Sequence, residues 1–82
     1  MTIIIEKTLK TETSHYAAMT CGKTSAYIGV TKWGWNVCVN NSAHKVWGGM
    51  GKFFASYEAA LAAYKSAEMK AILNHAREVL AV

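Results

Sequence analysis

Short β-prone runs separated by turn-forming residues, followed by one alanine-rich segment, are the feature that most constrains the fold of this sequence. The alternation is clearest where Trp35, Val37 and Val39 fall on one side of an extended chain and the residues between them fall on the other. Strands are expected at residues 26–31, 35–40 and 44–48. A single helix covers only one face of such a three-stranded antiparallel sheet. The sequence therefore predicts a second face that can bind a partner.

The alanine-rich segment predicts one C-terminal helix that begins after Ser56 and ends near Leu80. The Ser56 hydroxyl suits an N-cap, and Glu58 follows at the positive end of the helix dipole. Nine alanines lie between positions 55 and 81, and alanine has the highest helix propensity and little bulk. The apolar stripe expected to face the sheet consists of Leu61, Tyr64, Ile72, Val79 and either Ala60 or Ala71.

The first 24 residues predict an additional N-terminal strand or hairpin. Residues 2–9 include three consecutive isoleucines and have strand character, and residues 10–14 form a polar turn. Residues 15–21 fit either a strand or a helical turn. We therefore expect an α+β protein in which an arm, residues 1–24, precedes a sheet-plus-helix domain, residues 25–82.

The charge of the chain is distributed unevenly. Of 82 residues, nine are Lys or Arg and five are Asp or Glu, which gives a formal net charge of +4. Residues 1–55 carry the whole excess, because the three basic and three acidic residues after them cancel. A basic half is typical of proteins that bind polyanions. No apolar run is long enough for a membrane helix, and no signal peptide is evident, so a cytoplasmic location is expected.

The sequence offers no recognisable catalytic or metal site. Cys21 and Cys38 are the only cysteines, and no CxxC motif or Cys/His cluster accompanies them, so each is expected to be a buried thiol. Aspartate is absent, and there is no Walker loop, HExxH motif or Ser/His/acid arrangement. The sequence predicts a non-enzymatic protein that needs no cofactor and no metal.

Four segments resemble the Apetala or ethylene-response-factor type of DNA-binding domain. Tyr27, Gly29 and Val30 match its first strand, residues 35–39 its Trp-containing second strand, and Lys45-Val46-Trp47 its third strand. Residues 54–64, FASYEAALAAY, match its helix, and the likeness covers about half of the chain. This resemblance implies a three-stranded sheet that lies in the DNA major groove, as in the related arm-type domains of phage integrases. The chain has no nuclease or recombinase portion, so the resemblance implies a stand-alone module.

The chain departs from that family at the positions that read guanine. The family uses several strand arginines, whereas the corresponding residues here are Ile28, Thr31, Cys38 and Asn40. The only arginine is Arg77, in the predicted helix. Binding with weak sequence preference is therefore expected.

The predicted site combines lysines, asparagines and tryptophans on one sheet face. Lysines neutralise phosphates, asparagines pair with adenine edges, and tryptophans contact sugars or thymine methyl groups. The alternative for each tryptophan is burial beneath the N-terminal arm. The expected DNA-binding residues are Thr31, Lys32, Trp33, Asn36, Asn40, Lys45 and Trp47.

Two functions remain open from the sequence. In the first, the protein binds double-stranded DNA through this basic, Trp-bearing face. In the second, it is a protein-interaction module, comparable to a small phage effector, that binds a partner protein through the same face or through residues 3–5. Association into a homodimer is compatible with either function.

Overall fold

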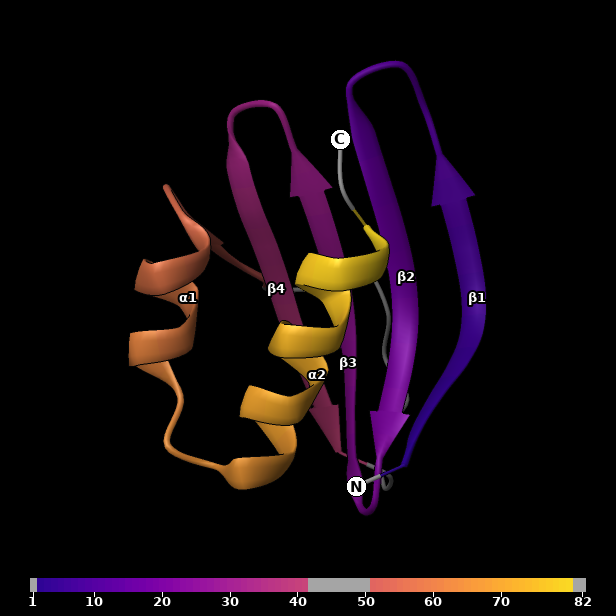
Figure 1. Ribbon diagram of the computed structural model, residues 1–82, viewed down its shortest axis with the longest axis vertical. Coiled ribbons are helices and arrows are strands. Elements are labelled where there is room, and N and C mark those ends of the chain that lie inside the picture. The colour runs from indigo at the N-terminus through magenta and orange to yellow at the C-terminus, as the bar shows by residue number, and fades with distance from the viewer. Residues whose placement is uncertain (1, 42–50, 81–82) are drawn as a thin grey trace.

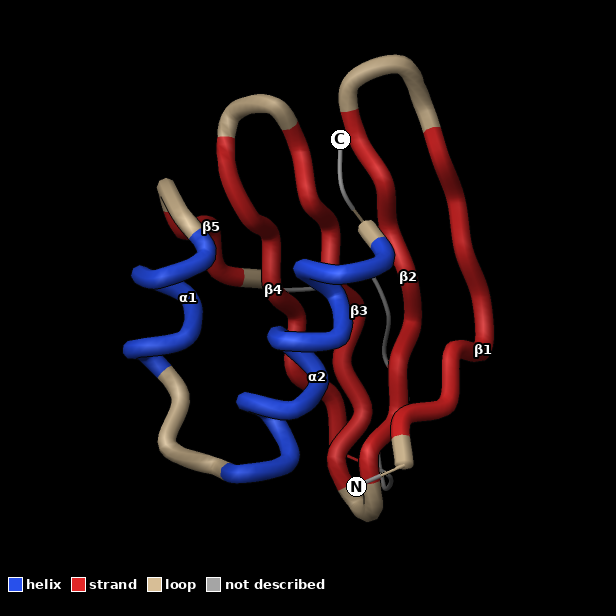
Figure 2. Tube along the Cα trace, in the orientation of Figure 1, coloured by secondary structure: helices blue, strands red, loops and turns tan. Residues whose placement is uncertain are grey.

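The computed structural model describes residues 2–41 and 51–80 and consists of a sheet layer and a helix layer (Figure 1). The described strands form one antiparallel sheet in the order β1-β2-β3-β4-β5, so each strand pairs with its neighbour in the sequence (Figure 2). Two helices, α1 and α2, lie on the same face of this sheet. The bounds are β1 (Ile3–Lys10), β2 (Ser14–Cys21), β3 (Thr24–Thr31), β4 (Gly34–Asn41), β5 (Lys52–Phe54), α1 (Tyr57–Ala63) and α2 (Ala67–Val79).

The predicted α+β class is confirmed, but the predicted three-stranded sheet with one helix is wrong. The expected strands at 26–31 and 35–40 correspond to β3 and β4. The expected strand at 44–48 lies outside the described residues, and β4 pairs on its second side with the short β5 instead. The N-terminal hairpin, β1 and β2, joins the same sheet because β2 pairs with β3 along its whole length.

Two tight connections set the geometry of the first hairpins. Between β1 and β2, the Thr11 amide donates to the Ser14 carbonyl at 2.8 Å, and the Ser14 amide donates to the Thr11 hydroxyl at 3.1 Å. Between β2 and β3, Gly22 has φ of 61°, a left-handed conformation that glycine adopts without steric cost. The second connection contains only two residues, so it fixes the register in which Cys21 pairs with Thr24.

The predicted single helix is divided into two by a capping residue inside it. Ser56 caps α1 as predicted, accepting from the Ala59 amide at 3.1 Å. Ser66 caps α2 in the same way, accepting from the Met69 amide at 3.3 Å. Tyr64, at the end of α1, has an extended backbone. The alanine content alone predicts one continuous helix, whereas the extended residue Tyr64 ends α1 and the cap at Ser66 starts a second helix, α2.

Tyr64 also joins the end of α1 to the sheet. Its ring meets the Phe54 ring edge-on, with the centroids 6.0 Å apart. Burial raises the pKa of the Tyr64 phenol, and Cys38 makes a smaller contribution in the same direction. The phenol is therefore neutral at physiological pH and serves as an apolar contact.

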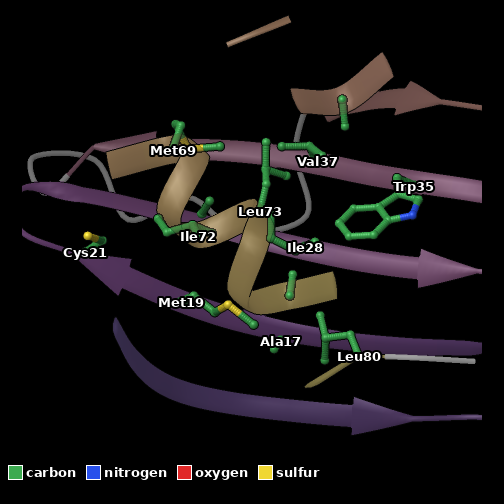
Figure 3. Packing of buried hydrophobic residues seen from close by; sticks show 13 residues of the cluster. Ala17, Met19, Cys21, Ile28, Trp35, Val37, Met69, Ile72, Leu73 and Leu80 are labelled. Carbon is green, nitrogen blue, oxygen red and sulfur yellow. The ribbon is translucent and has the colours of Figure 1, made fainter. Parts of the chain in front are cut away.

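Side chains from β2, β3, β4 and α2 form the core (Figure 3). Ile72 and Leu73 of α2 are fully buried against Met19, Ile28 and Val37 of the strands. The break at Ser66 changes the phase of the helix, so Met69, Leu73 and Ala76 take buried positions that the predicted stripe did not include. Val79, which was predicted to face the sheet, is 39% exposed. The tilted contact between Trp35 and Tyr57, at 5.5 Å, extends this core under α1.

One carboxylate connects α2 to the tip of the central hairpin. Glu68, in the first turn of α2, accepts from the Thr24 hydroxyl at 2.7 Å and from the Lys23 amide at 3.3 Å. Cys21 is buried beside this turn, as predicted, whereas Cys38 is only half-buried. Among the described helices, none has the length and apolar content needed to cross a membrane.

We expect Leu73→Ala to lower the free energy of unfolding by about 2–5 kcal/mol, because it leaves a cavity between α2 and the sheet. Val79→Ala, in the same helix but on its exposed side, is the matched control and is expected to change stability by only about 0.5 kcal/mol. Urea denaturation followed by circular dichroism measures both. Equal costs at the two positions would contradict the packing described above.

Candidate nucleic-acid interface

The face of the sheet opposite the helices, called the outer face below, carries the candidate site. Strand register aligns its side chains in rows that cross the sheet. One row crosses all five strands and consists of Leu9, Tyr16, Gly29, Asn36 and Phe53. The next row consists of Lys7, Ala18, Tyr27 and Cys38. No described helix or strand packs over these rows.

Tyr16 and Tyr27 form a stacked pair at the centre of this face, called the tyrosine pair below. Their ring centroids lie 5.9 Å apart, and the ring planes differ by only 12°. Each tyrosine has a small residue as its cross-strand partner, because Tyr16 pairs with Gly29 and Tyr27 pairs with Ala18. Small partners leave room for both rings on the surface of the sheet.

Gly29 is required by the close approach of the Tyr16 ring. A Cβ atom at position 29 would lie 2.4 Å from two carbon atoms of that ring, far inside van der Waals contact. Glycine in the middle of a strand weakens the strand, so its presence commonly marks such a close approach. The missing side chain at position 29 thus allows the Tyr16 ring to lie against the β3 backbone.

A hollow of about 270 Å³ adjoins the tyrosine pair on the side of β1. Among the described residues it is lined by Lys7, Thr8, Leu9 and Tyr27. An aromatic ring, an aliphatic side chain and an ammonium group therefore border one small depression. This combination suits a flat, partly apolar group that carries negative charge nearby.

The β3–β4 turn places two more of the relevant side chains at one end of the sheet. The Thr31 hydroxyl accepts from the amides of Trp33 and Gly34, each at 3.1 Å, and holds the turn closed. The Lys32 ammonium lies 5.0 Å from the centroid of the Trp33 ring, within cation–π range. Trp33 is 65% exposed, so the aromatic surface and the positive charge at this turn are both accessible.

The sheet part contains two carboxylates: Glu12, in the β1–β2 turn next to the β3–β4 turn, and Glu6, near the opposite end of β1 and β2. There the Thr20 hydroxyl donates to the Glu6 carboxylate and lies 3.0 Å from the Ser25 hydroxyl. A carboxylate at this position repels phosphate. The part of the outer face that suits a polyanion therefore extends from Lys7 and the tyrosine pair towards the β3–β4 turn.

The two layers differ in charge. Among the described residues, the sheet and its connections contain five lysines and two glutamates, a net charge of +3. The helices and their connections contain three basic and three acidic residues, which cancel. The positive lysines of the sheet part are Lys7, Lys10, Lys23, Lys32 and Lys52. The fold thus converts a charge difference along the sequence into a difference between layers.

The structure brings part of the predicted site together. Lys32 and Trp33 form the β3–β4 turn, and Thr31 ends β3 just before it, although the Thr31 hydroxyl is occupied by hydrogen bonds within the turn. Asn36 is exposed on the outer face and is the third residue of β4 after this turn. Asn40 lies in β4 opposite Ser25. Lys45 and Trp47 lie outside the described residues.

Sequence reasoning missed the tyrosine pair, Lys7 and Phe53. A signal for the pair is present, since β2 contains Tyr-x-Ala and β3 contains Tyr-x-Gly. In antiparallel strands these two patterns place each ring opposite a small residue. These patterns can be aligned only when the β2–β3 register is known. The sequence does not give this register, because residues 15–21 fit either a strand or a helical turn.

No described group of three or more His, Cys, Asp or Glu side chains is arranged to hold a metal ion. Comparison with known proteins found no matching family model, no matching curated protein and no matching solved structure. The resemblance to Apetala-type domains therefore stays a prediction from the sequence.

We expect Gly29→Ala to lower the free energy of unfolding by about 1–3 kcal/mol, because the added methyl group displaces the Tyr16 ring. In a Tyr16→Ala background the same change should cost almost nothing, since the ring is absent. A double-mutant cycle measured by urea denaturation gives the coupling between the two positions. An equal cost in both backgrounds would show that the ring does not lie against Gly29.

Proposed function

We propose that this protein is a non-enzymatic nucleic-acid-binding protein that uses the outer face of its sheet. The tyrosine pair supports this function, because two half-buried aromatic rings add apolar contact surface to the outer face. The positive charge of the sheet layer supports it as well, since phosphate contacts supply most of the affinity in such complexes. Lys7 lies in β1, in the row that contains Tyr27, and Lys32 lies in the β3–β4 turn, beyond the row of Tyr16. A cytoplasmic location stays a prediction from the sequence.

The width of the sheet bears on how double-stranded DNA would bind. Three strands span about 10 Å between the outer strand axes, which is compatible with a major groove about 12 Å wide. Five strands span about 19 Å at the same spacing. The complete outer face is therefore too wide to enter the groove. Duplex DNA would be contacted through the β3–β4 turn, where Lys32 and Trp33 project.

The second candidate function is binding of a partner protein through β1. Ile4 and Leu9 are each 56% exposed on this strand, and β1 is the outermost strand on its side of the described sheet. The register of β1 shifts between Ile5 and Lys7, which is a bulge. Bulges and lysines are devices that prevent edge strands from pairing with other chains. The exposed isoleucine favours this function, whereas the bulge opposes strand addition beyond residue 5.

We expect the double substitution Lys7→Ala and Lys32→Ala to weaken nucleic-acid binding and to lower the salt dependence of the affinity. Removing two phosphate contacts reduces the slope of log K against log salt concentration by about 1–2. Fluorescence anisotropy of a labelled oligonucleotide of about 15 nucleotides, at about 50 mM and about 200 mM salt, measures both quantities.

The control is the double substitution Lys65→Ala and Lys70→Ala. It removes the same charge from exposed positions in the helix part of the chain and should leave the slope unchanged. If both double variants lose the same affinity, binding follows net charge and not the sheet face. Absence of salt-dependent binding to any nucleic acid would overturn the proposed function. Recovery of one stoichiometric partner protein from a nuclease-treated lysate, abolished by Ile4→Lys, would then support the second candidate.

A further inference from the structure

We propose that a second copy of this chain pairs with β1, so that the sheets of two molecules join edge to edge in a symmetric dimer. The two β1 strands run antiparallel about a two-fold axis that passes between Glu6 and Lys7. This inference goes beyond the proposed function and does not depend on it. It names one occupant for β1, which is a second copy and not the unrelated partner protein of the second candidate function.

The strand β1 is exposed on both of its faces. Every residue from Ile4 to Lys10 is exposed, whereas none of the eight residues of the neighbouring strand β2 is. β1 is also the outermost strand on its side of the described sheet (Figure 2). The N–H and C=O groups along this free edge are therefore available to pair with a further strand. Ile4 and Leu9 add apolar surface beside them, because each is 56% exposed.

The register with β2 assigns the residues of β1 to the two faces of the sheet. The residues on the outer face are Ile4, Lys7 and Leu9. The residues on the helix side are Ile3, Ile5, Thr8 and Lys10. Glu6 is the extra residue of the bulge, since the register passes directly from Ile5 to Lys7. As a result, Ile5 and Thr8 share a face although they are three positions apart.

An antiparallel register of two β1 strands matches these faces at every position outside the bulge. Residues directly opposite each other in paired strands point to the same face of the sheet. With Ile4 opposite Leu9 of the second copy, both side chains lie on the outer face. Ile5 then lies opposite Thr8 of the second copy, and both face the helix side. A slip by one residue would place outer-face residues opposite helix-side residues.

The same register pairs the charges of the strand. Glu6 lies opposite Lys7 of the second copy, and by symmetry Lys7 lies opposite Glu6, so two ion pairs flank the axis. The Thr20 hydroxyl donates to Glu6 and holds its carboxylate over the outer face, which is also the face of Lys7. Moving the register so that Lys7 lies opposite Ile4 also keeps the faces matched, but it places Glu6 opposite Ile5. Charge complementarity therefore selects the first register.

The bulge at Glu6 fits a second copy and not a regular strand of another protein. A bulged strand carries one extra residue, so a regular partner strand loses its alignment at that point. In the dimer, both strands carry the same extra residue next to the axis. Each copy then places Glu6 and Lys7 between Ile5 and Thr8, and the register continues across the bulge without a shift.

The dimer leaves the outer face of each molecule open. Pairing uses the free edge of β1 and not the surface of the sheet, so Lys32 and Trp33 at the β3–β4 turn stay exposed. The Lys7 ammonium has three donors, and an ion pair with Glu6 leaves donors for a phosphate. Association through β1 is therefore compatible with the proposed function.

Analytical ultracentrifugation of the purified full chain, without nucleic acid, tests the dimer. Small interfaces are typical of reversible complexes, so the average mass should rise from monomer towards dimer between about 10 and about 500 µM. Lys7→Glu and Glu6→Lys each place like charges across the axis and should raise the dissociation constant at least about 10-fold. The combined variant with both changes exchanges the charges on both strands and should restore association. An equimolar mixture of the two single variants should form a mixed dimer for the same reason.

The matched control is Lys65→Glu, which makes the same change of charge at an exposed position between the two helices and should leave association unchanged. Circular dichroism of each variant checks that the fold is retained. The inference is overturned by a chain that stays monomeric over this range, by single variants that associate like the unmodified chain, or by a combined variant that does not recover. Because no nucleic acid is present, each of these outcomes leaves the proposed function intact.

Discussion

The pairing of β2 with β3 is the constraint on which the rest of the structure depends. In this register Ala17 and Ile28 face the helices, while Ala18 and Tyr27 face outwards. A slip by one residue would exchange the two faces, because side chains alternate along each strand. Core and candidate site are therefore both defined by a single register. The two-residue turn at Gly22 fixes it.

Small residues in the two central strands serve both faces of the sheet. On the helix side, Ala17 and Ala26 are completely buried, and their small size allows α2 to approach the sheet closely. On the outer side, Gly29 and Ala18 leave space for the rings of the tyrosine pair. Replacing these small residues by larger ones would disturb the packing of α2 on one face and the tyrosine pair on the other.

The sequence predicted those parts of the fold that depend on local patterns. Alternation identified β3 and β4, the polar residues 10–14 identified the first turn, and Ser56 identified the start of α1. Ser66 was missed because alanine content favours helix on both sides of it, whereas the cap competes through a single hydrogen bond. The strand identity of residues 15–21 depends on pairing with β3, which is a tertiary contact that periodicity alone does not supply.

The candidate site was predictable to a smaller extent, for a physical reason. Lys32, Trp33 and Asn36 are near one another in sequence, so a tight turn is enough to bring them to one end of the sheet. The two residues of the tyrosine pair are 11 positions apart in the sequence and lie in β2 and β3. Lys7 lies in a third strand, β1, and comes near the pair only because β1 joins the sheet. Sites assembled across strands require register, and register requires the complete sheet.

The connectivity of the sheet has a consequence for how the chain is made. Every described pairing joins strands that follow one another along the chain. Strands β1 to β4 can therefore pair one after another during synthesis from the N-terminus. The helix that covers Met19 and Ile28 follows all the described strands along the chain. Until α2 has left the ribosome, the apolar side chains on one face of the nascent sheet are uncovered. Formation of the core is thus delayed until α2 has been synthesised.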